Sequence, residues 1–156
     1  MQQQLLALIT NPFLITGVTS WMIAQVLKAM IHAVINKKFD MTRLFGDGGM
    51  PSGHSATVSS LAMFSALSFG LGSFEFAISA IFAIIVCHDA MGVRHETGKQ
   101  AAILNEVIKT LGLITEKKIR MDEKLKEFVG HTPAQVFAGI LVGISNALVM
   151  HFFVFA

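Results

Sequence analysis

This sequence is poor in charge, and it contains no tyrosine, one cysteine, one tryptophan and three prolines. Only 14% of its 156 residues are charged and 53% are hydrophobic, whereas soluble domains carry about 25% charged residues. This composition excludes an ordinary soluble domain and indicates a single membrane domain over residues 1–156. Cys87 is the only cysteine, which excludes a disulfide within the chain. A formal charge of +2, without a basic–aromatic stripe, argues against nucleic-acid binding.

The sequence contains long apolar segments. Four of them are long enough to cross a bilayer, which takes about 20 residues as a helix. They cover approximately residues 13–35, 55–71, 74–93 and 133–155. The sequence starts with MQQQ, without the basic region or cleavage site of a secretory signal, so we expect the first segment to be retained. The predicted fold is an all-α bundle of four transmembrane helices.

The distribution of basic residues predicts the orientation. All 12 Lys and Arg residues lie in two stretches, 28–43 and 94–126. By the positive-inside rule both stretches face the cytoplasm, and both termini then lie outside. An even number of spans agrees with that arrangement.

The connection over residues 94–132 contains further structure. Its apolar residues recur at helical spacing between about 98 and 113, which predicts an amphipathic cytoplasmic helix. We expect this helix to lie in the membrane interface or to pack under the bundle. Residues 116–127 are densely charged and are interpreted as a solvated connection.

Three clusters of chemically capable residues lie at the cytoplasmic ends of the predicted spans. Residues 48–55 read GGMPSGHS, residues 88–100 read HDAMGVRHETGKQ, and residues 130–135 read GHTPAQ. Glycines allow successive backbone N–H groups to curve around an anion, and a helix start adds the positive end of its dipole. The first and third clusters therefore predict anion-binding helix starts on one face of the membrane.

Each of these helix starts has a histidine beside it, His54 in the first cluster and His131 in the third. Thr132 is a good N-cap and Pro133 a good first helical residue, so His131 directly precedes a helix start. A histidine can transfer a proton near neutral pH. We therefore expect the two histidines to point at one phosphate.

Cationic side chains supply the charge that a phosphate site needs. Lys28 lies within the first span, where a lysine is costly; it either serves function or extends to the headgroups. Arg94 and Lys99 offer further positive charge, and an arginine can contact a phosphate through two N–H groups. Asp89 either orients a histidine or pairs with Arg94, and the pairing is favoured.

These motifs resemble a known superfamily. Residues 51–54 (PSGH) resemble the central motif of the type-2 phosphatidic acid phosphatase superfamily, which includes lipid phosphatases and vanadium-dependent haloperoxidases. Residues 130–133 (GHTP), followed by AGILVG at 138–143, resemble its third motif. Together with Lys28, residues 48–56 and 89–101, and Asn105, the pattern is similar to the divergent bacterial and plastid branch.

The resemblance implies a lipid phosphatase in a bacterial inner membrane that works through a phosphohistidine and needs no metal or cofactor. On that scheme His131 is the nucleophile, and His54 is the general acid that protonates the leaving alkoxide. The groups implied to hold the phosphate oxygens are Lys28, Ser52, the Gly53 N–H and Arg94. The expected substrate is a lipid phosphate monoester or pyrophosphate.

The sequence also departs from the superfamily pattern. The superfamily has an aspartate four residues after the nucleophilic histidine, where this chain has the neutral Gln135. Its motif arginines are missing as well, so Arg94 and Asp89 are candidates to replace the absent arginine and carboxylate. Gln135 therefore favours a rival function, a non-catalytic membrane protein that binds a phosphorylated lipid or anion as a regulator or transport component. The expected partners are a phosphorylated lipid and the bilayer, and a homo-oligomer is left open.

Overall fold

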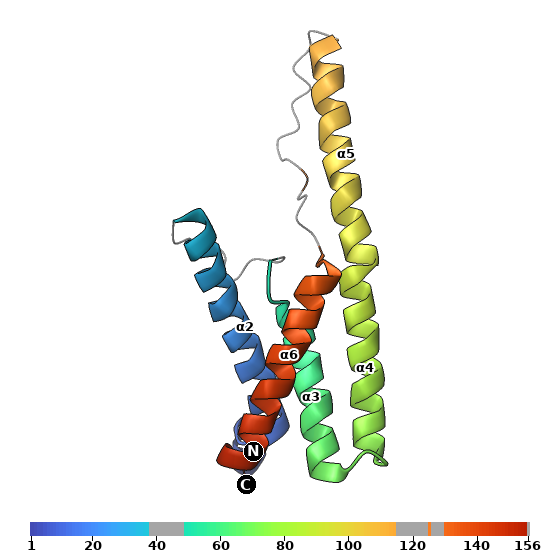
Figure 1. The fold of residues 1–156 in the computed structure, drawn as a ribbon. Coiled ribbons are helices and arrows are strands. Elements are labelled where there is room, and N and C mark those ends of the chain that lie inside the picture. Colours follow the sequence, from blue (N-terminus) through green and yellow to red (C-terminus); the bar gives the residue numbers. More distant parts are fainter. Residues whose placement is uncertain (38–48, 115–124, 126–129, 156) are drawn as a thin grey trace.

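The computed structural model describes residues 1–37, 49–114, 125 and 130–155, and every regular element within these ranges is helical (Figure 1). This confirms the all-α class. The elements are α1 (Gln2–Ile9), α2 (Pro12–Asn36), α3 (Gly53–Phe69), α4 (Phe74–Met91), α5 (Val93–Ile114), α6 (Pro133–Val149) and a π-helical turn, η2 (Met150–Val154).

Three helices within the described residues are long and apolar enough to cross a membrane: α2, the helical stretch Phe74–Leu111, and Pro133–Val154. The fourth expected span, α3, has 17 residues, which is about 26 Å at the α-helical rise and shorter than a hydrocarbon core of about 30 Å. It ends where Gly70 adopts a positive φ of 84°. The structure thus supports three of the four expected spans by length and composition.

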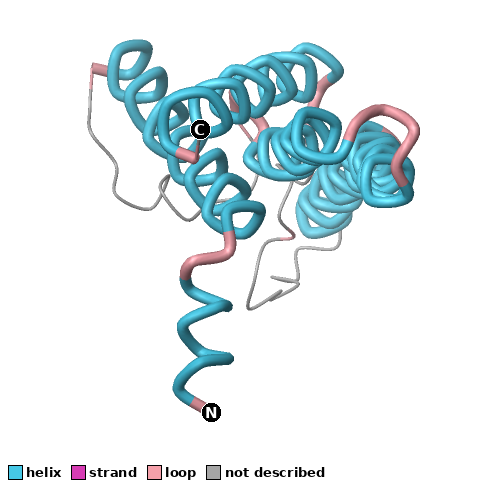
Figure 2. The backbone as a smooth tube through the Cα atoms, turned by 90° about the horizontal axis from the view of Figure 1, so that it is seen from below, coloured by secondary structure: helices cyan, strands magenta, loops and turns pink. Residues whose placement is uncertain are grey.

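Helices α2, α3, α4 and α6 run alternately up and down, and α3 contacts each of the other three (Figure 1). Both termini and the α3–α4 turn lie at the lower end in Figure 1. The C-terminal ends of α2 and α4 and the N-terminal ends of α3 and α6 lie at the opposite end, here called the upper end. Seen from below, α1 extends away from the bundle, and none of its residues is buried (Figure 2).

The closest helix contact joins α3 and α6 through two glycines. A Cβ at Gly139 would collide with the Ser52 carbonyl oxygen, and one at Gly143 would collide with Ser59 Oγ and the Ala56 carbonyl oxygen. Glycines at such positions let two membrane helices approach with their backbones nearly in contact. The consequence for the site is that α3 and α6 start side by side.

A polar contact joins α6 to α2. The Asn146 amide Nδ2 donates hydrogen bonds to Ser20 Oγ at 2.8 Å, to Thr19 Oγ1 at 3.0 Å and to the Thr16 carbonyl oxygen at 3.3 Å. Within a bilayer such interhelical hydrogen bonds replace water as partners for polar side chains. They fix α2, and with it Lys28, relative to α6.

The amphipathic helix expected over residues 98–113 is present as α5, but it does not pack under the bundle. It continues α4 beyond the upper end, and apolar side chains such as Ile103 and Leu104 are exposed (Figure 1). The reason is that Gly92 hardly interrupts the helix: its N–H donates to His88 O at 2.8 Å and its carbonyl accepts from Glu96 N at 3.0 Å.

The remainder of the connection is described only at Leu125 and from residue 130 onwards. The Asn105 side chain on α5 donates to the Leu125 carbonyl at 3.0 Å and accepts from its N–H at 3.3 Å. The expected solvated connection over 116–127 otherwise lies outside the described residues, as do Gly48 and the basic residues Lys38 and Arg43.

Candidate phosphate site

His131 lies at the upper end, directly before α6, and its backbone is bonded to α4. It is 3% exposed, and its backbone N–H donates to the Ala90 carbonyl at 2.9 Å. Its ring Nδ1 lies 3.3 Å from Gln135 Oε1, which also accepts from the Thr132 N–H at 3.1 Å. Because this oxygen only accepts, the contact favours the tautomer of His131 that carries its proton on Nδ1.

The second histidine lies next to the first. His54 is exposed in the first turn of α3, and its ring centroid is 6.0 Å from that of His131. The Ser52 N–H donates to the Gln135 carbonyl at 3.0 Å, which ties the two helix starts together. The structure therefore brings together the two histidines that the sequence predicted to share a site.

Lys28 belongs to the same site, although it comes from α2. It is only 5% exposed, so it does not extend into solvent. Its aliphatic stem packs on Gly49, where an added Cβ would lie 3.3 Å from Lys28 Cγ, and Gly49 has a positive φ of 88°. A buried lysine is a strong attraction for an anion, because its charge is poorly screened by water.

These surroundings lower the pKa of His131 below its ordinary value of 6.5. Burial of the ring is the largest cause, and the nearby charges of Lys28 and His54 act in the same direction. Hydrogen bonds to Gln135 and to the Gly49 backbone oppose the shift without reversing it. His131 is therefore neutral at pH 7, as a nitrogen nucleophile must be.

The start of α3 provides backbone donors. Ser52 caps the helix: its Oγ accepts from Ser55 N at 3.4 Å and from Ser55 Oγ at 3.1 Å, and the residue is fully buried. The N–H groups of Gly53 and His54 donate to no other described residue. Ser52 thus shapes the site mainly as a cap, while these two N–H groups are available to an anion.

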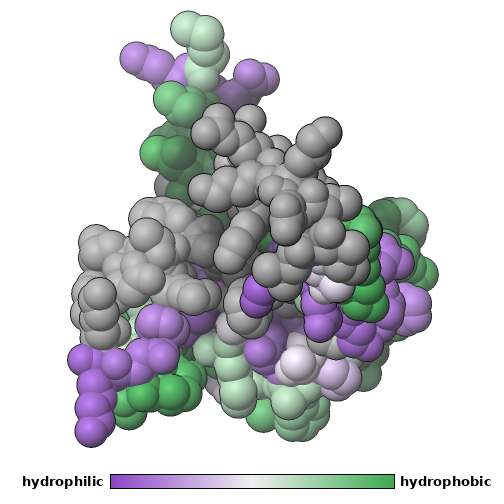
Figure 3. All heavy atoms as spheres, turned by 90° about the horizontal axis from the view of Figure 1, so that it is seen from above, coloured by the Kyte–Doolittle hydropathy of each residue, from purple (hydrophilic) through white to green (hydrophobic). Residues whose placement is uncertain are grey.

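Seen from above, hydrophilic and hydrophobic groups of the described residues lie beside one another in separate patches (Figure 3). The profile of the family described as the Divergent PAP2 family matches residues 9–146, a stretch that contains every residue of this site. The chain belongs to the divergent PAP2 family. This confirms the resemblance drawn from residues 51–54 and 130–133.

A curated relative supports the assignment to the divergent PAP2 family. The Uncharacterized membrane protein YuiD of Bacillus subtilis (strain 168) is 40% identical over 156 residues, covering 94% of this chain and 98% of that protein. No solved structure matches the chain.

Two cations that the sequence analysis expected in the site of this divergent PAP2 protein pair with acidic side chains. Arg94 Nε pairs with Asp89 Oδ2 at 2.8 Å, which confirms the pairing that the sequence favoured, and both side chains are about half exposed. Lys99 pairs with Glu96 at 2.7 Å and is also exposed. Because α5 continues α4 outwards, it carries both cations onto a solvent-facing surface. No interaction recorded between described residues joins either of them to His131.

One residue of the site was missed by the sequence reasoning. Gln25 on α2 is 8% exposed, and its Oε1 is buried without a hydrogen-bond partner among the described residues. Its Cδ lies 3.9 Å from where a Cβ on Gly53 would be. The available signal was its spacing, three residues before Lys28 on the same face of the first span.

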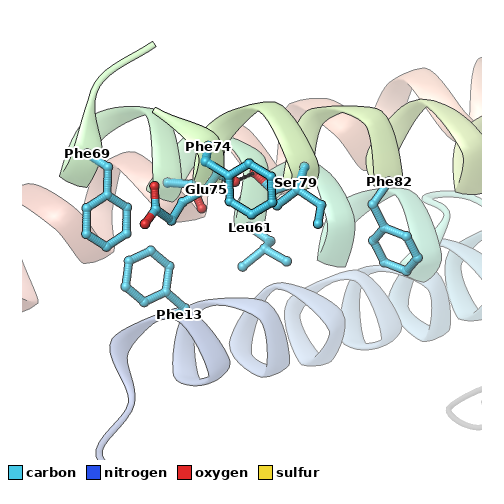
Figure 4. A pocket seen from close by; sticks show the side chains of 9 residues that line it. Phe13, Leu61, Phe69, Phe74, Glu75, Ser79 and Phe82 are labelled. Atoms are coloured by element: carbon cyan, nitrogen blue, oxygen red, sulfur yellow. Dashed lines mark hydrogen bonds between the residues drawn. The ribbon is translucent and has the colours of Figure 1, made fainter. Parts of the chain in front are cut away.

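An apolar groove of about 560 Å³ lies apart from this site, between α2, α3 and α4 at the lower end (Figure 4). It is lined mainly by aromatic and aliphatic side chains, including Phe13, Phe69, Phe74 and Phe82. Such a surface suits the hydrocarbon of the bilayer and offers no catalytic pair.

Proposed function

We propose that this protein is a membrane phosphatase that hydrolyses a lipid phosphate monoester or pyrophosphate through a phosphohistidine. The observation that carries the proposal is His131, which is buried, has a lowered pKa and is oriented by the contact of Nδ1 with Gln135. The neighbouring His54 supplies a group that can donate and accept protons. Membership of the divergent PAP2 family supports the same chemistry.

The reaction proceeds in two balanced steps. In the first, the Nε2 lone pair of His131 attacks phosphorus and forms a P–N bond while the ester P–O bond breaks. The leaving alkoxide takes a proton from His54. In the second, neutral His54 removes a proton from water, the oxygen attacks phosphorus, and the P–N bond breaks to release inorganic phosphate and neutral His131.

Charge stabilisation during both steps comes from Lys28 and from the N–H groups of Gly53 and His54. These donors are in place before the substrate binds, which is the main source of rate enhancement in phosphoryl transfer. Gln135 orients the His131 ring as an aspartate would, but a neutral amide stabilises the positive charge of the phosphohistidine less. Turnover is therefore slow compared with an enzyme that carries a carboxylate there.

The proposed topology has four spans, with α3 crossing a locally thin part of the bilayer, and an upper end that faces the cytoplasm. The basic residues of the described helices lie in the C-terminal half of α2 and on α5, toward the upper end, and both termini share the lower end. A lipid phosphate then reaches the site from the inner leaflet while its acyl chains stay in the bilayer.

A second candidate function is a non-catalytic membrane protein that binds a phosphorylated lipid or anion. It is favoured by the neutral Gln135 at the aspartate position and by Arg94, which pairs with Asp89 at the surface. Such a protein would use the same donors without turnover.

Phosphate release separates the two functions. The purified chain is supplied in detergent with phosphatidate, phosphatidylglycerol phosphate and undecaprenyl pyrophosphate, beside His131→Asn and the control His151→Asn, which alters a histidine at the lower end. We expect release from at least one lipid by wild type and the control, and none by His131→Asn. Binding without release by any of the three proteins would reject the phosphatase and support the second candidate.

A further inference from the structure

Glu75 is an isolated charge at the lower end of the bundle. Residues 1–27, 48–88 and 130–156 contain no Lys, Arg or Asp, and Glu75 is their only Glu. It lies in the first turn of α4 and is exposed. Within the described part of the chain, no hydrogen bond or ion pair involves its carboxylate. The start of α4 favours a negative charge there, and the carboxylate oxygens stay open to a partner from outside the chain.

Glu75 lines the apolar groove of Figure 4. The α4 side of this groove consists of Glu75, Ile78, Ser79 and Phe82, whose spacing places them on one face of the helix. Phe82 lies about 10 Å along the helix axis from Glu75, at the α-helical rise. The groove therefore has a carboxylate near the end of the span and an apolar lining that continues toward the middle of the bundle. Its volume of about 560 Å³ is typical of small-molecule sites.

Two phenylalanines form the wall of the groove near this carboxylate. Phe13 on α2 and Phe69 on α3 stack with their ring centroids 5.3 Å apart. Phe64, which is buried, contacts Phe13 edge to face at 5.0 Å and holds that ring in place. Figure 4 shows the Glu75 carboxylate on the side of the groove where Phe13 and Phe69 lie. Aromatic rings and a carboxylate both attract a cation, so this end of the groove favours a positively charged group.

We propose that this groove binds a phospholipid whose headgroup ends in a primary ammonium, with the ammonium on Glu75 and an acyl chain along the groove. The charge of the headgroup complements the only carboxylate of the lining, and the acyl chain matches the apolar residues beyond it. The Ser79 hydroxyl does not compete for the headgroup, because it donates to the Glu75 and Phe76 carbonyls at 2.7 and 3.0 Å. The site is separate from the phosphate site at the upper end and shares no residue with it.

A primary ammonium fits this site better than a trimethylammonium group of the same charge. It offers three N–H donors to a carboxylate that only accepts, and such charge-assisted hydrogen bonds are short and strong. A trimethylammonium group has no N–H donor, and its methyl groups keep the charge away from the carboxylate oxygens. The lipid class expected in the groove is therefore the ethanolamine type, taken from the leaflet that surrounds the lower end.

The test measures which lipid occupies the groove. In a Trp21→Phe background, which removes the only tryptophan, Phe82→Trp places a fluorophore at the inner end of the groove. The control Ile81→Trp places one at an exposed position of α4 that does not line the groove. The full chain is reconstituted in phosphatidylcholine bilayers that contain phosphatidylethanolamine or phosphatidylcholine with brominated acyl chains. Bromine quenching then gives the relative binding constant of these two lipids, which have the same net charge.

We expect the ethanolamine lipid to bind about threefold or more tightly than the choline lipid at position 82, and both to bind equally at position 81. Glu75→Gln removes the charge and keeps the shape of an exposed side chain, so it should abolish the preference at position 82. The control Glu106→Gln, on the exposed surface of α5, should keep it.

Three results would overturn the proposal: equal binding of the two lipids at position 82, a preference that persists in Glu75→Gln, or the same preference at position 81. A tryptophan at position 82 that neither lipid quenches, beside normal quenching at position 81, would also overturn it. The groove would then be covered by protein, such as a second copy of the chain.

Discussion

At the scale of single residues, the pair His131 and Gln135 defines what this site can do. The glutamine oxygen holds the ring Nδ1 at 3.3 Å and takes part in capping α6. One amide therefore sets the start of a helix and the orientation of the candidate nucleophile. The consequence is a histidine with fixed geometry but without a compensating negative charge.

Gln135→Asp is expected to make the site a better phosphatase. A carboxylate beside Nδ1 raises the pKa of His131 and stabilises the positively charged phosphohistidine, so turnover should rise about tenfold or more. Phosphate release measured against pH should also show the acid limb of the activity moving to higher pH. Gln100→Asp on α5 is the control, and equal turnover in all three proteins would contradict a catalytic role for this position.

The lowered pKa of His131 predicts an acid-sensitive stability. The unfolded chain binds a proton at His131 below about pH 6.5, whereas the folded chain binds it only at lower pH. Protonation of His131 therefore lowers the free energy of unfolding as the pH falls below about 6.5. Above that pH the residue causes no change in stability. Unfolding in detergent between pH 7.5 and 5 should show wild type losing stability more steeply than His131→Asn. If the free energy of unfolding fell equally with pH in both proteins, the pKa of His131 would be the same in the folded and unfolded chains.

At the scale of helices, the site depends on how closely α3 and α6 approach. Gly139 and Gly143 set this distance, and Asn146 joins α6 to α2. The small residues of the third motif therefore align the two helix starts, with the N–H groups and histidines that we propose to share one ligand.

Gly139→Ala is expected to disturb both stability and function. Its Cβ would collide with the Ser52 carbonyl oxygen, a backbone atom that cannot rotate away, so the helix starts must separate. We expect a loss of about 1–3 kcal/mol in the free energy of unfolding, together with weaker lipid binding. Gly72→Ala, in the α3–α4 turn with nothing within 4 Å, is the matched control. Wild-type melting and binding by Gly139→Ala would show that the helix contact is not tight.

Much of this arrangement could be predicted from local sequence, and the limits have physical causes. The starts of α3 and α6 follow from Ser52, Thr132 and Pro133, because capping and proline geometry act over a few residues. The direction of α5 could not be predicted, since Gly92 permits either a turn or a continuing helix. Gln25 was missed because it is neutral, and its unpaired state is visible only once α2 packs against α3.

At the scale of the whole molecule, the two ends of the bundle carry different features. The upper end carries the candidate phosphate site and α5, and the lower end carries both termini, the α3–α4 turn and the aromatic groove of Figure 4. If the positive-inside rule holds, the site faces a cytoplasmic pool of water and inner-leaflet lipids. Function therefore depends on the side of the membrane on which the upper end lies.

Cysteine labelling tests this orientation directly. With the buried Cys87 replaced by Ser, single cysteines are introduced as Gly72→Cys in the lower turn and Lys109→Cys on α5. In intact cells a membrane-impermeant maleimide should label position 72, which lies outside, and should reach position 109 only after the membrane is permeabilised. The Cys87→Ser background alone is the control for unspecific labelling. Labelling of position 109 and protection of position 72 would invert the topology and move the phosphate site to the outer face. The substrate would then have to be a lipid of the outer leaflet, because charged headgroups do not cross the hydrocarbon core unaided.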